Sequence, residues 1–107
     1  MDLALKAIAD PTRRRILSLV WHDEQPAGAI AARFDMSQPA VSQHLKVLLE
    51  AGLVTLRREG TKRFYRADHR AMTAVRQLIE AFWDERLAAL KHAAEAEQRA
   101  QRKPSDG

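Results

Sequence analysis

The chain has 107 residues, of which 18 are lysine or arginine and 14 are aspartate or glutamate, giving a net charge of +4 at pH 7. This length suits one domain, and the positive charge favours a polyanionic partner. The absence of cysteine excludes disulfides, thiolate metal sites and thiol redox switching. No apolar run approaches the roughly 18 residues that span a bilayer, and no signal-peptide pattern opens the chain, so we expect no membrane partner and a cytoplasmic location.

Two helices are predicted at the start of the chain. Apolar residues from Leu3 to Ile8 indicate a brief first helix that ends at Asp10. Asp10 and Pro11 then supply the N-cap and first-turn proline of a second helix. Its buried side is expected to contain Ile16, Leu17 and Val20, with Leu19 nearby. The arginines from Arg13 to Arg15 spread around its first half, where they are either solvated or available to a phosphate or to an acidic residue of a second chain.

A helix, a tight turn and a second helix are predicted between residues 27 and 51. The polar connection from Trp21 to Gly28 leads into a short alanine-rich helix from Ala29 to Phe34, which buries Ile30 and Phe34. Asp35 and Met36 form the turn. This order of elements is typical of the helix-turn-helix unit of DNA-binding proteins.

The second of these helices has clear boundaries and two different faces. Ser37 is a good N-cap, Pro39 fits the first turn, and Gly52 is a typical stop. One face is apolar and is expected to be buried: Val41, Leu45, Leu48 and Leu49. The opposite face is polar and uncharged near the helix start, and its candidate base-reading residues are Gln38, Pro39, Ser42 and Gln43. Glutamine can bond an adenine edge and proline can contact a thymine methyl, so this helix is predicted to read DNA.

A β-hairpin is predicted from Leu53 to Ala67, with a turn from Glu59 to Lys62. Its inward side chains are expected to be Val54 and Leu56, opposite Tyr65 and Ala67, with Thr55, Arg57 and Arg63 outward. Five residues between 57 and 66 are basic: Arg57, Arg58, Lys62, Arg63 and Arg66. Such a hairpin after a reading helix is typical of a wing that grips DNA, although charges also protect edge strands from pairing with other chains. The candidate phosphate contacts are Ser37, His44, Lys46, Arg57, Arg58, Lys62 and Arg63.

One long helix is predicted from His69 or Arg70 to about Arg102. Met72, Val75, Ile79 and Phe82 follow a heptad-like seam, which Leu78, Trp83, Leu87 and Leu90 widen. A helix of about 30 residues is roughly 45 Å long, so part of its apolar band requires a second chain and another part covers its own domain. We therefore expect one domain, residues 1–102, and a disordered tail, residues 103–107.

Motifs along the chain resemble the ArsR/SmtB family of bacterial winged helix-turn-helix repressors, from Leu3 to about Leu90. They are Ala9 to Leu17, Ser37 to Leu48, Ala51 to Val54, and Arg57 to Gly60 followed by Phe64-Tyr65. The resemblance implies a mainly α fold with a small β-hairpin: four helices, the hairpin and a fifth helix. It also implies a homodimer joined by the first and last helices. The expected interface residues are Leu3, Leu5, Met72, Val75, Ile79, Phe82, Trp83 and Leu87.

The chain departs from the family's metal sensors. Thiolate sensors carry cysteines before the reading helix, where this chain has only Ala, Gly and Ile from Ala27 to Ala32. The other sensor type pairs an Asp and a His with a His-x-x-Glu, which His92 and Glu95 match; Asp84 is present, but Arg86 stands where the first His belongs. A metal site needs three or four convergent ligands, so we expect a branch without metal or other cofactor, and the His92/Glu95 pair is the weak alternative.

The leading hypothesis is a sequence-specific transcriptional regulator, a homodimeric repressor of its own or an adjacent operon that binds a palindromic operator in double-stranded DNA. An architectural protein that grips DNA without choosing sequence is the second hypothesis. An enzyme has little support, because no nucleophile arrangement or phosphate-binding glycine loop is present. The effector remains open: a small apolar ligand between the last helices, a partner protein, or none.

Overall fold

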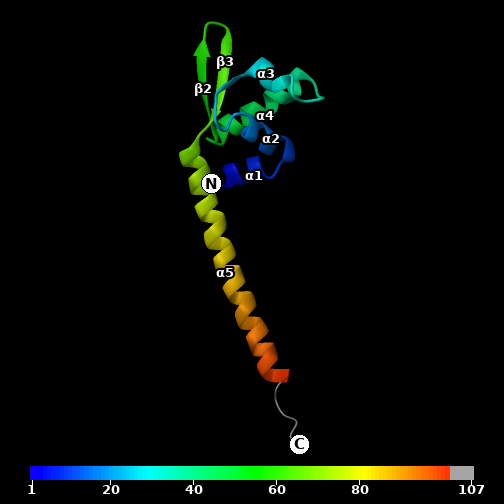
Figure 1. The fold of residues 1–107 in the computed structure, drawn as a ribbon, viewed down its shortest axis with the longest axis vertical. Coiled ribbons are helices and arrows are strands. Elements are labelled where there is room, and N and C mark those ends of the chain that lie inside the picture. The colour runs from blue at the N-terminus through cyan, green and yellow to red at the C-terminus, as the bar shows by residue number, and fades with distance from the viewer. Residues whose placement is uncertain (102–107) are drawn as a thin grey trace, which may run out of the picture. The chain divides into compact units, whose positions relative to one another are not determined.

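A computed structural model describes residues 1–101, whose elements are shown in Figure 1. In chain order they are α1 (Asp2–Ile8), α2 (Pro11–Leu19), β1 (Gln25–Pro26), α3 (Ala27–Ala31), α4 (Gln38–Glu50), β2 (Val54–Glu59), β3 (Lys62–Ala67) and α5 (His69–Gln101). This order confirms the mainly α fold with a small hairpin and adds β1, which the sequence did not predict. The chain divides after Val75, within α5, into two compact units.

Helix α2 begins where the sequence predicts, whereas α1 ends at Ile8, two residues before the predicted end at Asp10. The Asp10 carboxylate accepts hydrogen bonds from the backbone N–H of Thr12 at 2.8 Å and of Arg13 at 3.1 Å, and Pro11 occupies the first turn. These bonds, the one from Arg13 first, lower the pKa of Asp10. Ile16, Leu17 and Val20 are buried, as expected.

The sheet has three antiparallel strands in the order β1-β3-β2. Val54 pairs with Ala67 and Leu56 with Tyr65, which confirms the predicted register. Gly60 lies in the turn with a φ of 61°, a left-handed conformation that glycine adopts without strain. The short β1 pairs with the other edge of β3, so β3 is the central strand and β2 an edge.

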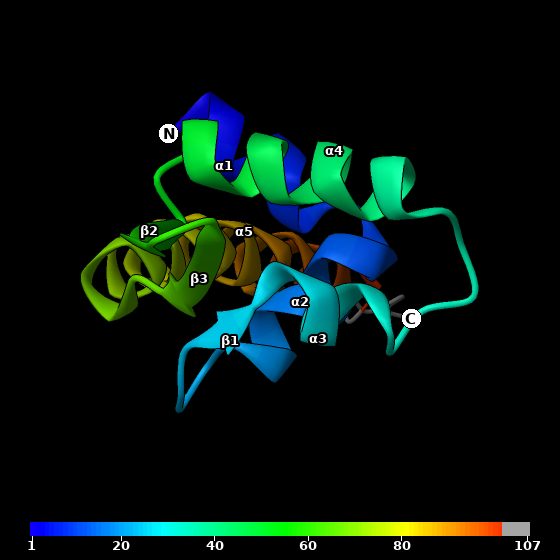
Figure 2. The same cartoon turned by 90° about the horizontal axis from the view of Figure 1, so that it is seen from above.

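The helix-turn-helix unit consists of α3 and α4, seen from above in Figure 2. Helix α3 begins and ends earlier than the predicted range from Ala29 to Phe34, because Pro26 starts it directly after β1. Ile30 is buried, whereas Phe34 is only half-buried. In α4, the Ser37 hydroxyl accepts the Ala40 N–H at 3.2 Å, which confirms the N-cap, and Gly52 has the left-handed φ of 75° expected of a stop.

The prediction that Leu49 belongs to the buried apolar face of α4 is wrong. Val41, Leu45 and Leu48 are almost completely buried, but Leu49 is 36% exposed. Successive helical residues are rotated by about 100°, so a residue adjacent to a narrow buried stripe turns toward its edge. The core contact of α4 is therefore a stripe of three residues.

Helix α5 follows Asp68, whose carboxylate accepts the N–H of Arg70 at 3.0 Å and of Ala71 at 3.1 Å. Val75 is 2% exposed, which corrects its assignment to the interface with a second chain, because it packs in the core of the first unit. Five apolar side chains of the second unit are 41–66% exposed: Leu78, Phe82, Trp83, Leu87 and Leu90. The predicted tail, residues 103–107, and the predicted helix end at Arg102 lie outside the described residues. Among the helices of residues 1–101, none combines the length and apolarity needed to cross a bilayer.

Replacing Leu48 by alanine is expected to lower the free energy of unfolding by about 2–5 kcal/mol, because it leaves a cavity in the core. Leu49→Ala is the matched control and should cost less than about 1 kcal/mol, since that side chain already contacts solvent. Urea denaturation followed by circular dichroism at one fixed protein concentration measures both. Equal losses would contradict the placement of α4.

Candidate nucleic-acid interface

The exposed face of α4 carries all four predicted base-reading residues. Gln38, Pro39, Ser42 and Gln43 are each exposed, whereas Ala40 and Val41 between them turn inward. Their spacing over the first two turns of the helix puts them on one side. The result is a contiguous uncharged surface with two amides, a hydroxyl and an apolar ring, a donor and acceptor set suited to base edges.

Two further α4 residues predicted to contact phosphates have different surroundings. Lys46 is exposed, so its ammonium group is free to reach a partner. His44 is half-buried, and its Nδ1 lies 3.3 Å from Nη1 of Arg13. Because an arginine can only donate, Nδ1 accepts and Nε2 carries the ring hydrogen. His44 can thus reach a phosphate only through Nε2.

The three consecutive arginines of α2 contact their own chain, an outcome that neither sequence interpretation included. Arg13 donates from Nε to the Ala7 carbonyl at 2.8 Å and from Nη2 to the Lys6 carbonyl at 3.1 Å. Arg14 donates to the Ile8 carbonyl at 2.7 Å. The guanidinium carbon of Arg15 lies 4.6 Å from the centre of the Phe34 ring. Two of the arginines therefore bond carbonyls in the last turn of α1, where most carbonyls lack an i+4 backbone donor.

Three of the residues predicted to contact phosphates lie at exposed positions of the wing formed by β2, β3 and their turn, and take part in no ion pair within residues 1–101: Arg58, Lys62 and Arg63. Arg58 lies opposite Arg63 in the register, and Lys62 lies opposite Glu59. These three cationic side chains are free to contact phosphates.

Arg57, also predicted to contact phosphate, is instead held within the chain. Its Nε donates to both Glu24 oxygens at 3.2 and 3.1 Å, and its Nη1 donates to Glu59 at 2.9 Å. Its guanidinium carbon lies 4.5 Å from the centre of the Phe64 ring. The hydrogen bond from Arg57 lowers the pKa of Glu24, and the bonds to Glu24 and then Glu59 raise the pKa of Arg57. With two carboxylates around it, Arg57 does not fit the role of a free phosphate contact.

Glu24 is the residue at this surface that sequence reasoning missed. It lies 33 residues before Arg57, in a stretch whose residues indicate only a polar connection. The available signal was the proline at Pro26 next to an extended segment, because edge strands tolerate proline. A strand predicted at Gln25 and Pro26 and paired with the hairpin would have placed Glu24 next to the wing.

No cluster of three or more His, Cys, Asp or Glu side chains suited to a metal ion occurs within residues 1–101. His92 and Glu95 are both exposed on α5. One chain thus supplies this pair toward a site that needs three or four convergent ligands.

Known proteins resemble this chain over most of its length. A family model described as a helix-turn-helix domain matches residues 8–57. The HTH-type transcriptional regulator Rv2034 of Mycobacterium tuberculosis is 43% identical over 86 residues, which are 80% of either protein. The transcriptional repressor SdpR of Bacillus subtilis is 42% identical over 65 residues, 61% of this chain and 72% of that protein. A solution structure from Mycobacterium bovis has a TM-score of 0.63 and 33% identity over 78% of each chain, and is described as a homodimeric winged helix-turn-helix DNA-binding domain of a possible ArsR-family transcriptional regulator.

Replacing Glu24 by glutamine is expected to raise the affinity for duplex DNA of any sequence, because Arg57 loses its main carboxylate partner. The slope of log affinity against log salt should steepen by up to about 0.9, the value for one added phosphate contact. Fluorescence anisotropy with labelled duplexes at several salt concentrations measures both quantities. Glu80→Gln is the control, since it changes net charge equally and breaks the exposed pair with Arg76. An equal rise in both variants would attribute the effect to net charge and contradict the prediction.

The ion pair between Glu24 and Arg57 also makes the stability of the fold depend on pH. Because the pKa of Glu24 in the fold lies below its ordinary value of 4.5, the contribution of the pair to stability is complete above that value and is lost as pH falls through the lower folded pKa. The Glu24→Gln effect on DNA affinity should therefore not vary with pH between neutrality and about pH 6. A dependence within that range would show that another group controls the wing.

Proposed function

Since this chain belongs to the ArsR family of winged helix-turn-helix transcriptional regulators, we propose that it binds a palindromic operator as a homodimer. Membership of this family makes it a DNA-binding regulator of transcription, not an enzyme. The observation that carries the proposal is the uncharged exposed face at the start of α4, together with exposed cations on α4 and in the wing that take part in no ion pair within residues 1–101.

In the proposed complex, α4 of each subunit enters a major groove and reads bases through Gln38, Ser42 and Gln43. A glutamine can form two hydrogen bonds with one adenine, and Pro39 can contact a thymine methyl. Two-fold symmetry requires the two α4 helices to lie about 34 Å apart, one turn of DNA. The operator should therefore have half-sites whose centres are about 10 base pairs apart, or a multiple of that distance.

Phosphate contacts fix the position of α4 without reading sequence. We assign them to exposed cations of α4 and the wing: Lys46, Arg58, Lys62 and Arg63. Ser37 adds the N-terminal end of α4, where backbone N–H groups and the helix dipole favour an anion. His44 can add one donor through Nε2, provided that Arg13 keeps Nδ1 occupied.

The proposed dimer rests on the apolar side chains that one chain leaves exposed. Leu3 of α1 is 62% exposed, and in α5 Phe82, Trp83 and Leu87 are 52–56% exposed. Large exposed apolar patches on a soluble protein usually mark an interaction surface. The homodimeric Mycobacterium bovis structure favours a second copy as the partner. Half-buried residues at the edge of the proposed interface are Leu5, Met72 and Ile79.

We propose repression of its own or an adjacent operon as the outcome of binding. A dimer that covers a promoter excludes polymerase from the same DNA, and the Bacillus subtilis relative is named a repressor. Because the proposed partner is chromosomal DNA, we propose a cytoplasmic location. The architectural alternative, binding without sequence choice, is disfavoured by the uncharged face of α4, because nonspecific binding needs cations there rather than amides.

Replacing Gln43 by alanine is expected to cost about 1–3 kcal/mol of operator binding and to leave random-sequence binding nearly unchanged, because it removes a base contact. Lys62→Gln should instead weaken both by a similar factor and reduce the salt slope by about 0.9. The operator is first obtained by selection from random duplexes, and affinities are then measured at one salt concentration. An equal loss on both duplexes for Gln43→Ala, or no enrichment in the selection, would favour the architectural alternative.

Replacing Trp83 by glutamate is expected to give a monomer, because it places a charge in the proposed apolar interface. The variant should bind the operator at least about tenfold more weakly, since one subunit then holds one half-site. A reporter gene behind an operator-bearing promoter should be transcribed more with the variant than with the unaltered protein. Gln77→Glu adds the same charge to an exposed position off the seam and should stay dimeric. A dimeric Trp83→Glu protein in sedimentation contradicts the interface, and reduced transcription contradicts repression.

A further inference from the structure

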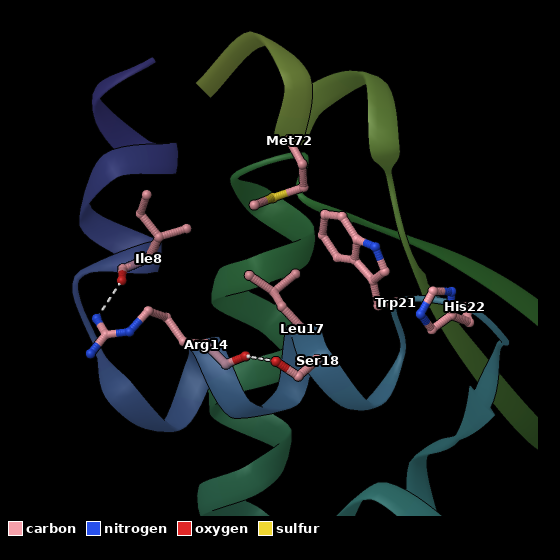
Figure 3. Close-up of a pocket in the computed structure, with 7 residues that line it drawn as sticks. All are labelled: Ile8, Arg14, Leu17, Ser18, Trp21, His22 and Met72. Atoms are coloured by element: carbon pink, nitrogen blue, oxygen red, sulfur yellow. Dashed lines mark hydrogen bonds between the residues drawn. The ribbon is translucent and has the colours of Figure 1, made fainter. Parts of the chain in front are cut away.

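A hollow of about 430 Å³ lies in the first unit, between α1, α2, the connection that follows α2, and the start of α5 (Figure 3). Leu17 forms part of its base, and Met72 and the ring of Trp21 form part of its walls. All its lining residues belong to the unit Met1–Val75. Its size falls in the range of sites for small organic molecules.

The polar groups that line this hollow favour an anion. Arg14 and His22 are its titratable residues, and no carboxylate lines it. Arg14 uses Nη1 to donate to the Ile8 carbonyl at 2.7 Å, and a guanidinium has five N–H donors in all. The Ser18 hydroxyl donates its hydrogen to the Arg14 carbonyl at 3.2 Å, so it is not available as a donor to a ligand. Arg14 is thus the principal donor available to a ligand, and it suits a carboxylate.

The aromatic wall of the hollow is held in place from outside it. The Trp21 carbonyl lies 2.7 Å from Nε2 of His69, and the rings of these two residues have centroids 4.7 Å apart. The neighbouring Val20 carbonyl accepts the backbone N–H of Ala67 at 2.9 Å. Trp21 is therefore fixed before any ligand binds, which lowers the entropic cost of stacking an aromatic ring on it.

We propose that this hollow binds a small aromatic carboxylate, with its carboxylate on Arg14 and its ring between Trp21, Leu17 and Met72. We further infer that this ligand is the effector of the regulator, a step that rests on the proposed function. A carboxylate on the remaining N–H donors of Arg14 shares the guanidinium with the Ile8 carbonyl, at the end of α1. The next residue, Arg13, joins that same end of α1 to His44 of α4. Occupancy thus acts on the contact that connects α1 to the DNA-reading helix.

The test uses naphthylacetate as the probe and the uncharged naphthylacetamide as its matched control. Nuclear magnetic resonance follows the two indole N–H signals of the 15N-labelled protein, from Trp21 and Trp83, without DNA. The acid is expected to shift the Trp21 signal and to bind at least about tenfold more tightly than the amide, as a charge-assisted hydrogen bond implies. Arg14→Gln should abolish this preference for the acid, and Arg14→Lys should keep part of it.

Arg15→Gln is the matched control variant, because Arg15 lies on the same helix outside the hollow and contacts Phe34. It should preserve the full preference for the acid. Thermal unfolding of the Arg14→Gln variant separates loss of the ligand from loss of the fold, since only a folded variant with unchanged amide binding supports the proposal.

Three results would overturn the proposed ligand. Equal affinity for acid and amide would refute the anionic class, and no shift of the Trp21 signal would refute the site. A chemical shift of the Trp21 indole that depends on protein concentration and does not respond to the acid would assign the hollow to a second copy of the chain.

The effector role has its own readout. Operator DNA must change the affinity for the acid by the same factor by which the acid changes operator affinity, because coupling between two sites is reciprocal. Acid that binds without changing operator affinity would overturn the effector role alone. A protein without sequence preference would overturn the proposed function, while the titration without DNA would still test the binding site.

Discussion

Burial of one stripe of α4 is the constraint on which the rest of the surface depends. Val41, Leu45 and Leu48 are each at most 1% exposed, so the rotation of the helix about its own axis is fixed by the core. Residues on the opposite side, Gln38 and Ser42 among them, are then exposed by helical geometry alone. The stripe accordingly links stability to function, because a helix that rotated would bury amides and expose leucine.

Several arginines of the first unit stabilise the fold itself and are not all available to DNA. Arg13 and Arg14 bond carbonyls at the end of α1, and Arg57 joins Glu24 and Glu59 at the base of the wing. Each of these guanidinium groups uses at least one of its donors on the chain itself. Net charge therefore overstates the number of cations available to DNA, and the unpaired cations of α4 and the wing matter more than the total of +4.

The sequence was most informative where a pattern is local. The caps at Asp10 and Ser37 are set within three residues of the helix they start, and the hairpin register follows from alternation around one turn. Those features were predicted correctly. The four base-reading candidates were found together because they lie within six residues of one helix.

Features that depend on distant parts of the chain could not be predicted. The pair between Glu24 and Arg57 joins residues 33 positions apart, and the two-residue β1 has too few side chains to show alternation. Val75 follows the same heptad as exposed residues of α5, so periodicity alone could not separate its burial in the core from a place at an interface. Leu48 belongs to the buried stripe of α4 and Leu49, the next residue, lies at its edge, so the apolar pattern alone could not separate the two.

The short β1 strand has a consequence for how this protein meets DNA. Pro26 is the last residue of β1, where it pairs with Phe64 of β3, and it is also the N-cap of α3. One residue thus belongs both to the sheet that carries the wing and to the helix-turn-helix unit, which limits hinge motion between them. We therefore expect the reading helix and the wing to meet a duplex with little change in their relative position, which favours a duplex whose grooves fit them. The flexibility of base steps that no side chain touches then becomes part of the sequence preference.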